Sequence, residues 1–272
     1  MRPGLDAATS AVLFGVPDAP SPRNRLARYF DQAASAALDL LFPPHCGACD
    51  TPLPERGNRY LCWTCAEKIG WIGVNRCRRC GDRVGLGSGV VDDCPSCRTH
   101  PPAFIKAGCA VAKYGEGPLR DLVLKMKFGS CPHLAMLFGT LLAARIVATG
   151  LSEGNPLLIP VPLTRTTFRS RTFNQAEEIA WCAAAKCGLS VEPRLLQKVR
   201  STPPQALLSL EQRRVNLKGA FACNQRVARR CAGRSIILVD DVITTGSTIS
   251  ECGRVLHAAG VKNIFAASVA RA

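Results

Sequence analysis

The chain has 272 residues, of which 47% are hydrophobic and 20% are charged, and its formal net charge at pH 7 is +15. This composition indicates a globular protein with one large or two modest domains, and it excludes a mainly disordered chain. The longest apolar runs are far too short to span a bilayer, and the apolar patch at residues 11–16 is a poor secretion signal. We therefore expect a cytoplasmic protein without a membrane span.

Positive charge is concentrated in the C-terminal part of the chain. Residues 1–100 contain 12 Lys and Arg against 10 Asp and Glu, whereas residues 101–272 contain 23 against 10. A basic surface of this kind suits a polyphosphate ligand or nucleic acid. A generally basic surface without a specific ligand is the alternative.

The N-terminal 44 residues divide into two segments. Residues 1–22 are rich in Pro and Ala and lack hydrophobic periodicity, which predicts disorder. Residues 23–44 are predicted to contain an amphipathic helix, because apolar side chains recur at helical spacing until Pro43-Pro44 ends the pattern. The apolar face is mostly alanine, which favours packing against the protein over binding to a membrane.

Four C-x-x-C pairs follow between residues 45 and 100. They are separated by 12, 11 and 13 residues and consist of Cys46/Cys49, Cys62/Cys65, Cys77/Cys80 and Cys94/Cys97. Two such pairs joined by a hairpin-length loop can place four thiolates around one Zn²⁺. Residues 45–100 are therefore predicted to form a double zinc ribbon with two closed, structural sites. An iron–sulfur cluster with four cysteine ligands is the alternative.

The residues beside the cysteine pairs indicate how the pairs combine. Asp50 and Gly81 stand where a tight knuckle needs a left-handed turn, and Cys65 leads into residues 66–69, which can begin a helix. This favours pairing in sequence order, with an interleaved cross-brace as the alternative. The seven other cysteines have apolar or Ala-rich neighbours, which indicates small core residues or inert surface thiols.

From residue 104 onward, strand and helix patterns alternate. Strands are predicted at residues 107–114, 157–162, 234–239 and 263–270, and helices at residues 119–127, 134–149, 174–187 and 248–259. This order indicates an α/β domain over residues 104–272, with a mostly parallel sheet covered by helices on both faces.

The stretch from Ile236 to Thr248 carries the clearest functional signal. An apolar strand is expected to end in the carboxylates Asp240 and Asp241, followed by a loop of small residues and a helix N-terminus. Backbone N–H groups at such a place favour an anion. The predicted phosphate-binding residues are Val242, Ile243, Thr244, Thr245, Gly246, Ser247 and Thr248. The two carboxylates suit the 2′ and 3′ hydroxyls of a ribose, or Mg²⁺ contacted through water.

This stretch resembles the 5-phosphoribosyl-1-pyrophosphate (PRPP) motif of type I phosphoribosyltransferases. Together with the cysteine pairs, it resembles the ComF family of bacterial competence-protein homologues, in which a double zinc ribbon precedes a phosphoribosyltransferase domain. The resemblance covers roughly residues 40–272. It implies a type I phosphoribosyltransferase fold, PRPP with Mg²⁺ as the ligand, and a role in natural transformation.

Basic residues outside the motif are expected to complete the site. The resemblance implies that the loop after residues 159–162 holds the pyrophosphate, and PRPP does require a second anion-binding loop. The residues expected to bind this pyrophosphate are Lys127, Arg165, Arg169 and Arg171. Lys125 is the alternative to Lys127, because residues two apart on a helix point in different directions. Asp240 and Asp241 would then orient the ribose.

Two further segments of the resemblance concern loop structure. Residues 171–176 resemble the family's R-G-F-N-Q-A but carry Thr172 where glycine is usual. If that position has a positive φ, the loop is strained or differs in this chain. Residues 200–205 and 213–216 match a segment that forms a mobile hood in related transferases.

Three functions are compatible with these observations. The first is an Mg²⁺-dependent phosphoribosyltransferase that acts on PRPP and an unknown acceptor. The second is a non-catalytic protein that binds PRPP or single-stranded DNA in DNA uptake or recombination, although the aromatic content of 6% allows few stacking platforms. The third is an adaptor that docks a protein partner through its zinc ribbon.

Overall fold

The computed structural model describes residues 43–54, 60–115, 117–128, 131, 133–164, 167–169, 173–202 and 210–272. The predicted disorder at residues 1–22 and nearly all of the predicted helix at residues 23–44 lie outside this part of the chain. The same holds for Arg165, Arg171 and Thr172.

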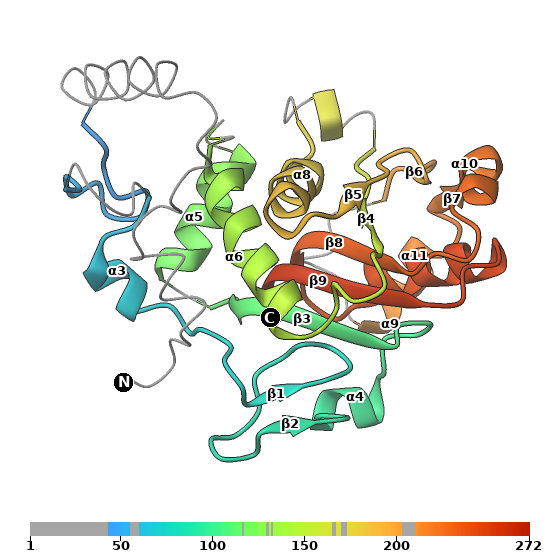
Figure 1. Cartoon of the computed structure of the whole chain (residues 1–272), viewed down its shortest axis with the longest axis horizontal. Coiled ribbons are helices and arrows are strands. Elements are labelled where there is room, and N and C mark those ends of the chain that lie inside the picture. Colours follow the sequence, from blue (N-terminus) through green and yellow to red (C-terminus); the bar gives the residue numbers. More distant parts are fainter. Residues whose placement is uncertain are drawn as a thin grey trace.

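A five-stranded sheet forms the centre of the α/β part (Figure 1). The strand order is β3-β9-β8-β4-β5, and every neighbouring pair is parallel, as predicted. The strands are β3 (Ala107–Lys113), β4 (Leu157–Pro160), β5 (Ser190–Val191), β8 (Ile236–Ile243) and β9 (Ile264–Arg271). Their near-continuous apolar sequences are typical of parallel strands that are buried on both faces.

Helices cover both faces of this sheet. Side chains alternate along β8, so Ile237 and Val239 join a first hydrophobic cluster and Ile236 and Leu238 join a second. The first cluster includes side chains of α5 (Pro118–Phe128), α6 (Leu134–Ala148) and α8 (Gln175–Cys187). The second includes side chains of α9 (Leu210–Leu217), α10 (Gln225–Arg230) and α11 (Ser247–Ala258). The predicted three-layer α/β fold is confirmed.

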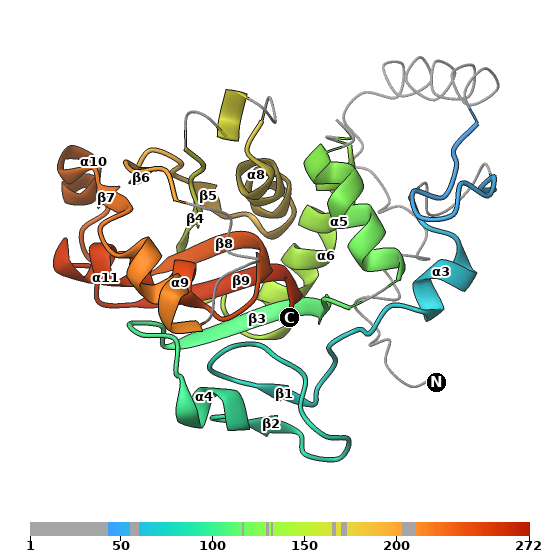
Figure 2. The same cartoon turned by 180° about the vertical axis from the view of Figure 1, so that it is seen from behind.

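A short antiparallel pair lies beside the second cluster. It consists of β6 (Leu196–Lys198) and β7 (Phe221–Cys223), which follow β5 and α9 in the chain. Figure 2 shows this pair near α10 and the end of β4. The pair therefore lies close to the carboxyl end of β4.

The cysteine-rich segment forms two small units with little regular structure. The first contains α3 (Trp63–Glu67), and the second contains β1 (Arg76–Cys77), β2 (Val90–Val91) and α4 (Pro95–Thr99). The connector between them runs along the edge strand β3, because Ile72 N donates to Val111 O at 2.9 Å and Lys113 N donates to Gly70 O at 2.8 Å. These bonds cover part of an edge that would otherwise be open.

The first hydrophobic cluster crosses from the cysteine-rich segment into the α/β part. Leu61, Ile69 and Trp71 belong to the same buried cluster as Leu122 and Phe138. The Trp71 indole donates to Ala66 O at 2.9 Å, so its polar atom is satisfied within the first unit. The two parts of the chain therefore share one core.

Within the described residues, no helix combines the length and the apolar composition that a bilayer crossing requires.

Candidate functional site

A small-residue loop joins β8 to α11 at the carboxyl end of the sheet. Gly246 has a φ of +76°, in the left-handed region that glycine adopts without the penalty of a Cβ. The hydroxyls of Thr245 and Ser247 lie 2.8 Å apart, and α11 begins at Ser247. The loop therefore brings hydroxyls and the N–H groups of a helix start to one place, which favours an anion.

The strand before this loop is longer than predicted. It was expected to end at residue 239, but it keeps its pairing with β9 as far as Ile243, opposite Arg271. Val242 and Ile243, predicted to bind phosphate, consequently lie within β8, and their side chains pack into the core. Thr244, Thr245 and Gly246 form the loop itself.

The two carboxylates point to opposite faces of the sheet, because neighbouring residues of a strand alternate. Asp241 is buried, and its Oδ2 lies 2.9 Å from the Nζ of Lys127 on α5. Asp240 faces the other side, where Lys198 and Cys252 are close enough to affect its electrostatics. The expectation that the strand ends in these two carboxylates is corrected, since pairing with β9 extends β8 past them to Ile243.

Helical geometry decides which lysine of α5 reaches the site. Lys127 contacts Asp241, whereas Lys125 lies 3.3 Å from Asp50 of the cysteine-rich segment. Residues two apart on a helix point in nearly opposite directions, so only one of these lysines can face β8. The sequence alone left this choice open.

Lys198 is a residue of the site that was not predicted from the sequence. It stands on β6, with its Nζ 5.6 Å from the centre of the Phe221 ring. Burial lowers the pKa of Lys198, while Cys252 and Asp240 act in the opposite direction. No local pattern marks this lysine, because β6 and β8 are distant in the sequence.

Asp240 has the most strongly perturbed carboxyl group of this site. Burial raises the pKa of Asp240 to about 7, and the charge of Asp241 adds to the rise. Lys127 and Lys198 act against this rise without cancelling it. Asp240 is therefore poised to gain or lose a proton near neutral pH.

Two cavities flank the chain after β4. The larger, of about 640 Å³, separates this loop from β6 and is lined by Pro162, Leu163, Thr164, Leu196, Gln197, Lys198, Val199 and Ser201. The smaller, of about 280 Å³, is lined by Pro160, Pro162, Leu163, Phe168, Arg169, Asn174, Glu177 and Pro193. Arg169, predicted to bind pyrophosphate, is exposed in the second cavity.

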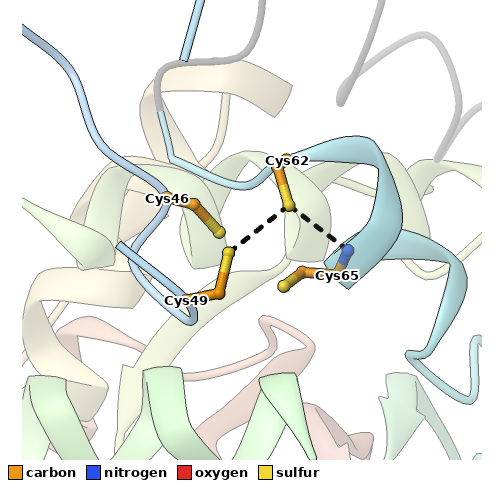
Figure 3. A group of neighbouring side chains, drawn as sticks. All are labelled: Cys46, Cys49, Cys62 and Cys65. Carbon is orange, nitrogen blue, oxygen red and sulfur yellow. Dashed lines mark hydrogen bonds between the residues drawn. The ribbon is translucent and has the colours of Figure 1, made fainter. Parts of the chain in front are cut away.

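The eight cysteines of the C-x-x-C pairs gather in two groups in sequence order. Within each group the sulfur atoms all lie within 4.8 Å of one another, and the groups are Cys46, Cys49, Cys62, Cys65 and Cys77, Cys80, Cys94, Cys97. Figure 3 shows the first group converging from a knuckle and from the start of α3. Asp50 and Gly81 have φ values of +57° and +74°, as their turn positions predict.

The sulfur spacing fits zinc. The Cys49 and Cys62 sulfurs are 3.7 Å apart, as are those of Cys80 and Cys94. Four thiolates at a Zn–S distance of about 2.3 Å in a tetrahedron require sulfur separations of about 3.8 Å. Both groups therefore fit closed structural zinc sites, and they differ in burial, because Cys49 of the first is exposed whereas the second is wholly buried.

Comparison with known proteins assigns both parts of the chain. A double zinc ribbon domain matches residues 37–98, and a phosphoribosyl transferase domain matches residues 188–272. DNA utilization protein YhgH of Salmonella typhi is 30% identical over 228 residues, which is 83% of this chain and 96% of that protein. Competence protein F of Haemophilus influenzae is 31% identical over 232 residues, covering 80% and 95% respectively.

The chain belongs to the ComF family. A 37-residue stretch is also 46% identical to Ribose-phosphate pyrophosphokinase 2 of Archaeoglobus fulgidus, over 14% of each chain. The phosphoribosyl transferase match of this ComF-family chain includes β8, the loop after it and α11. The family therefore accounts for the sheet, for the loop and for the two cysteine groups.

Three arginines of the second cysteine unit differ from one another in their carboxylate partners. Arg79 pairs with Asp93, and Arg78 lies 3.3 Å from Asp92 at the surface. Arg76 is half-buried without a carboxylate partner among the described residues. A cavity of about 340 Å³ is lined by Arg76, Arg78, Val90, Ala107, Gly108, Thr149 and Leu151.

Proposed function

We propose that this ComF-family chain binds PRPP or a similar phosphosugar with Mg²⁺ and transfers the phosphoribosyl group to an unknown acceptor. The observation that carries the proposal is an anion-binding loop that directly follows β8, together with two carboxylates in the second half of this strand. The short stretch of similarity to Ribose-phosphate pyrophosphokinase 2 supports a ribose phosphate as ligand.

Each part of the site has a role in this proposal. The loop Thr244–Gly246 and the start of α11 would bind the 5′-phosphate through N–H and hydroxyl groups. Asp240 and Asp241 would accept hydrogen bonds from the ribose hydroxyls or hold Mg²⁺ through water, since carboxylate oxygens are ligands that Mg²⁺ prefers.

The leaving pyrophosphate requires positive charge. Its departure from C1′ leaves an oxocarbenium-like sugar, and donors placed where charge develops lower the barrier. Bound Mg²⁺ would supply further neutralisation of the pyrophosphate oxygens. The side chains proposed to bind the pyrophosphate are Lys127, Arg165, Arg169 and Arg171, of which Lys127 is held 2.9 Å from Asp241.

Calorimetric titration of PRPP with Mg²⁺ tests the binding step. We expect saturable binding to the zinc-loaded protein, weakened by about tenfold or more, or about 1.4 kcal/mol, in Asp240→Asn and Asp241→Asn. The control is Asp92→Asn, the same change at an exposed aspartate of the second cysteine unit. Failure of the wild type to bind, or equal affinity in all variants, would refute the proposal. Pyrophosphate release with nucleobase, amine and nucleic-acid acceptors then tests the transfer.

DNA binding is a second candidate function. The names of two relatives, DNA utilization protein YhgH and Competence protein F, favour a role with DNA. Arg76 and Arg78 line a cavity, and the positive charges of Arg145 and Arg78 lie near Arg76. The Arg76 guanidinium, which has no carboxylate partner among the described residues, suits a phosphodiester, which neutralises positive charge and accepts hydrogen bonds.

Salt-dependent binding of single-stranded DNA tests this candidate. The variant Arg76→Ala/Arg78→Ala is expected to lower the affinity and to reduce the slope against log salt by about 1 to 2 between about 50 and 200 mM salt. The matched control is Arg229→Ala/Arg230→Ala, which removes the same charge from exposed positions on α10. Equal losses in both variants would indicate non-specific charge attraction and contradict a site at Arg76.

A further inference from the structure

The helix that carries Lys127 packs directly against the first cysteine unit. A Cβ added at Gly47, between Cys46 and Cys49, would lie 2.7 Å from Cδ2 of Leu122 on α5. Leu122 is almost completely buried in the first hydrophobic cluster. The knuckle, residues 46–49, therefore packs directly against the side of α5 that carries Leu122.

Opposite sides of α5 face the knuckle and the site. Leu122 and Lys125, three residues apart, face the first cysteine unit, where Lys125 lies 3.3 Å from Asp50. Val123 is fully buried, and Lys127, four residues later, contacts Asp241. The helix therefore contacts the first cysteine unit on one side and β8 on the other. Figure 1 shows α5 between α3 and α6.

The first cysteine unit also contacts the start of α6. The hydroxyl of Tyr60 donates to Sδ of Met136 at 3.8 Å, and the Tyr60 ring stacks on His133 with ring centres 6.5 Å apart. Gly47 N donates to Tyr60 O at 2.8 Å, which ties this contact to the knuckle. The knuckle therefore contacts α5 directly and the start of α6 through Tyr60.

Zinc bound by the four cysteines of the first unit would hold the knuckle in this position. The first unit is too small for a core of its own, and closed Cys₄ sites supply folding free energy to such units through zinc. The second unit makes different contacts, since Gly108 N of β3 donates to Arg78 O at 2.8 Å. Of these contacts, those with α5 are made by the first unit, whereas the second unit contacts β3.

We propose that the first zinc site positions Lys127, so that zinc bound by Cys46, Cys49, Cys62 and Cys65 sets the affinity of the phosphosugar site. Without the knuckle, Leu122 of α5 loses the surface against which it packs, and Lys127 is no longer held against Asp241. The inference rests on the proposed function for its effect on ligand affinity. The positioning of α5 by the knuckle is independent of which ligand binds.

Gly47→Val tests the contact without touching a zinc ligand. The added side chain must displace Leu122, whereas the control Gly73→Val adds the same atoms where nothing lies within 4 Å. Metal analysis first checks that each variant retains both zinc ions. Gly47→Val is then expected to bind PRPP with Mg²⁺ about tenfold more weakly than the wild type, and Gly73→Val is expected to bind it with the affinity of the wild type. Wild-type affinity in Gly47→Val would overturn the inference.

A double-mutant cycle separates positioning from a general loss of stability. Lys127→Met is expected to weaken binding, and Gly47→Val is expected to add little in the Lys127→Met background, because both changes remove the same interaction. Additive losses would show that the knuckle acts by another route and would overturn the inference.

Amide hydrogen exchange gives a readout that does not depend on PRPP. Faster exchange in residues 118–128, with residues 140–148 of α6 unchanged, is expected in Gly47→Val and in Cys49→Ser/Cys62→Ser. Unchanged exchange of α5 in both variants would overturn the inference. If the wild type fails to bind PRPP, the proposed function fails, and this exchange measurement still decides whether the knuckle positions α5.

Discussion

Asp240 and Asp241 are adjacent in the chain but lie in different environments. Strand alternation directs Asp241 toward α5, where it pairs with Lys127 at 2.9 Å, and directs Asp240 toward β6 and α11. One carboxylate is thus paired with a lysine, while burial raises the pKa of the other to about 7. Two identical side chains can therefore have different roles in one site.

The raised pKa of Asp240 predicts a pH-dependent stability difference. Between an ordinary value of about 3.9 and its folded value, the folded state holds a proton that the unfolded state has released. This contribution to stability is complete at low pH and is lost as the pH rises through about 7. Asp240→Asn cannot ionise. Its free energy of unfolding relative to that of the wild type is therefore expected to be higher at a pH of about 8.5 than at a pH of about 6.

Thermal unfolding of both proteins at the two pH values measures this difference. Asp92→Asn, at an exposed position, is expected to show the same difference from wild type at both pH values. A pH-independent difference between Asp240→Asn and the wild type would mean that Asp240 titrates outside this window.

At the scale of elements, one side chain joins the start of α8 to the end of β4. Asn174 is buried, its Oδ1 accepts from Ala176 N at 3.2 Å, and its Nδ2 donates to Val161 O at 3.2 Å. The first bond caps the helix, and the second fixes the chain where it leaves the sheet. Gly188, with a φ of +68°, ends the same helix as the sequence predicts.

Removal of this cap predicts a loss of stability. Asn174→Ala deletes both bonds and leaves Val161 O without this donor, so the free energy of unfolding is expected to fall by about 1–3 kcal/mol. Asn174→Ser keeps a capping hydroxyl but has no amide to donate to Val161 O, so it is expected to lose less. Urea unfolding measures both, and an Asn174→Ala protein as stable as the wild type would contradict the prediction.

At the scale of the whole molecule, the two cysteine units are built into the α/β part. Besides the shared core, Lys113 of β3 lies 2.9 Å from Asp82, and buried Arg145 of α6 donates to Gly73 O at 2.6 Å and to Ala110 O at 3.3 Å. The predicted division near residues 100–104 marks a change of sequence pattern, while packing continues across it. Zinc binding is consequently expected to contribute to the stability of the part that carries the proposed phosphosugar site.

Features that depend on short stretches of chain could be predicted from the sequence. The C-x-x-C spacing, the knuckle turns at Asp50 and Gly81, and the order of strands and helices are set by neighbouring residues. The loop after β8 was predicted for the same reason, because its small residues and the following helix are contiguous. PRPP, Mg²⁺ and the acceptor stay predictions, as does a protein partner of the zinc ribbon.

Only the tertiary structure decided what depends on residues distant in the chain. The length of β8 depends on β9, which extends it past Asp240 and Asp241 and separates their faces. Lys127 reaches Asp241 because α5 packs over the sheet, and Lys198 comes near Asp240 from the separate pair β6–β7. Such contacts follow from packing, which joins segments whose local sequences contain no record of one another.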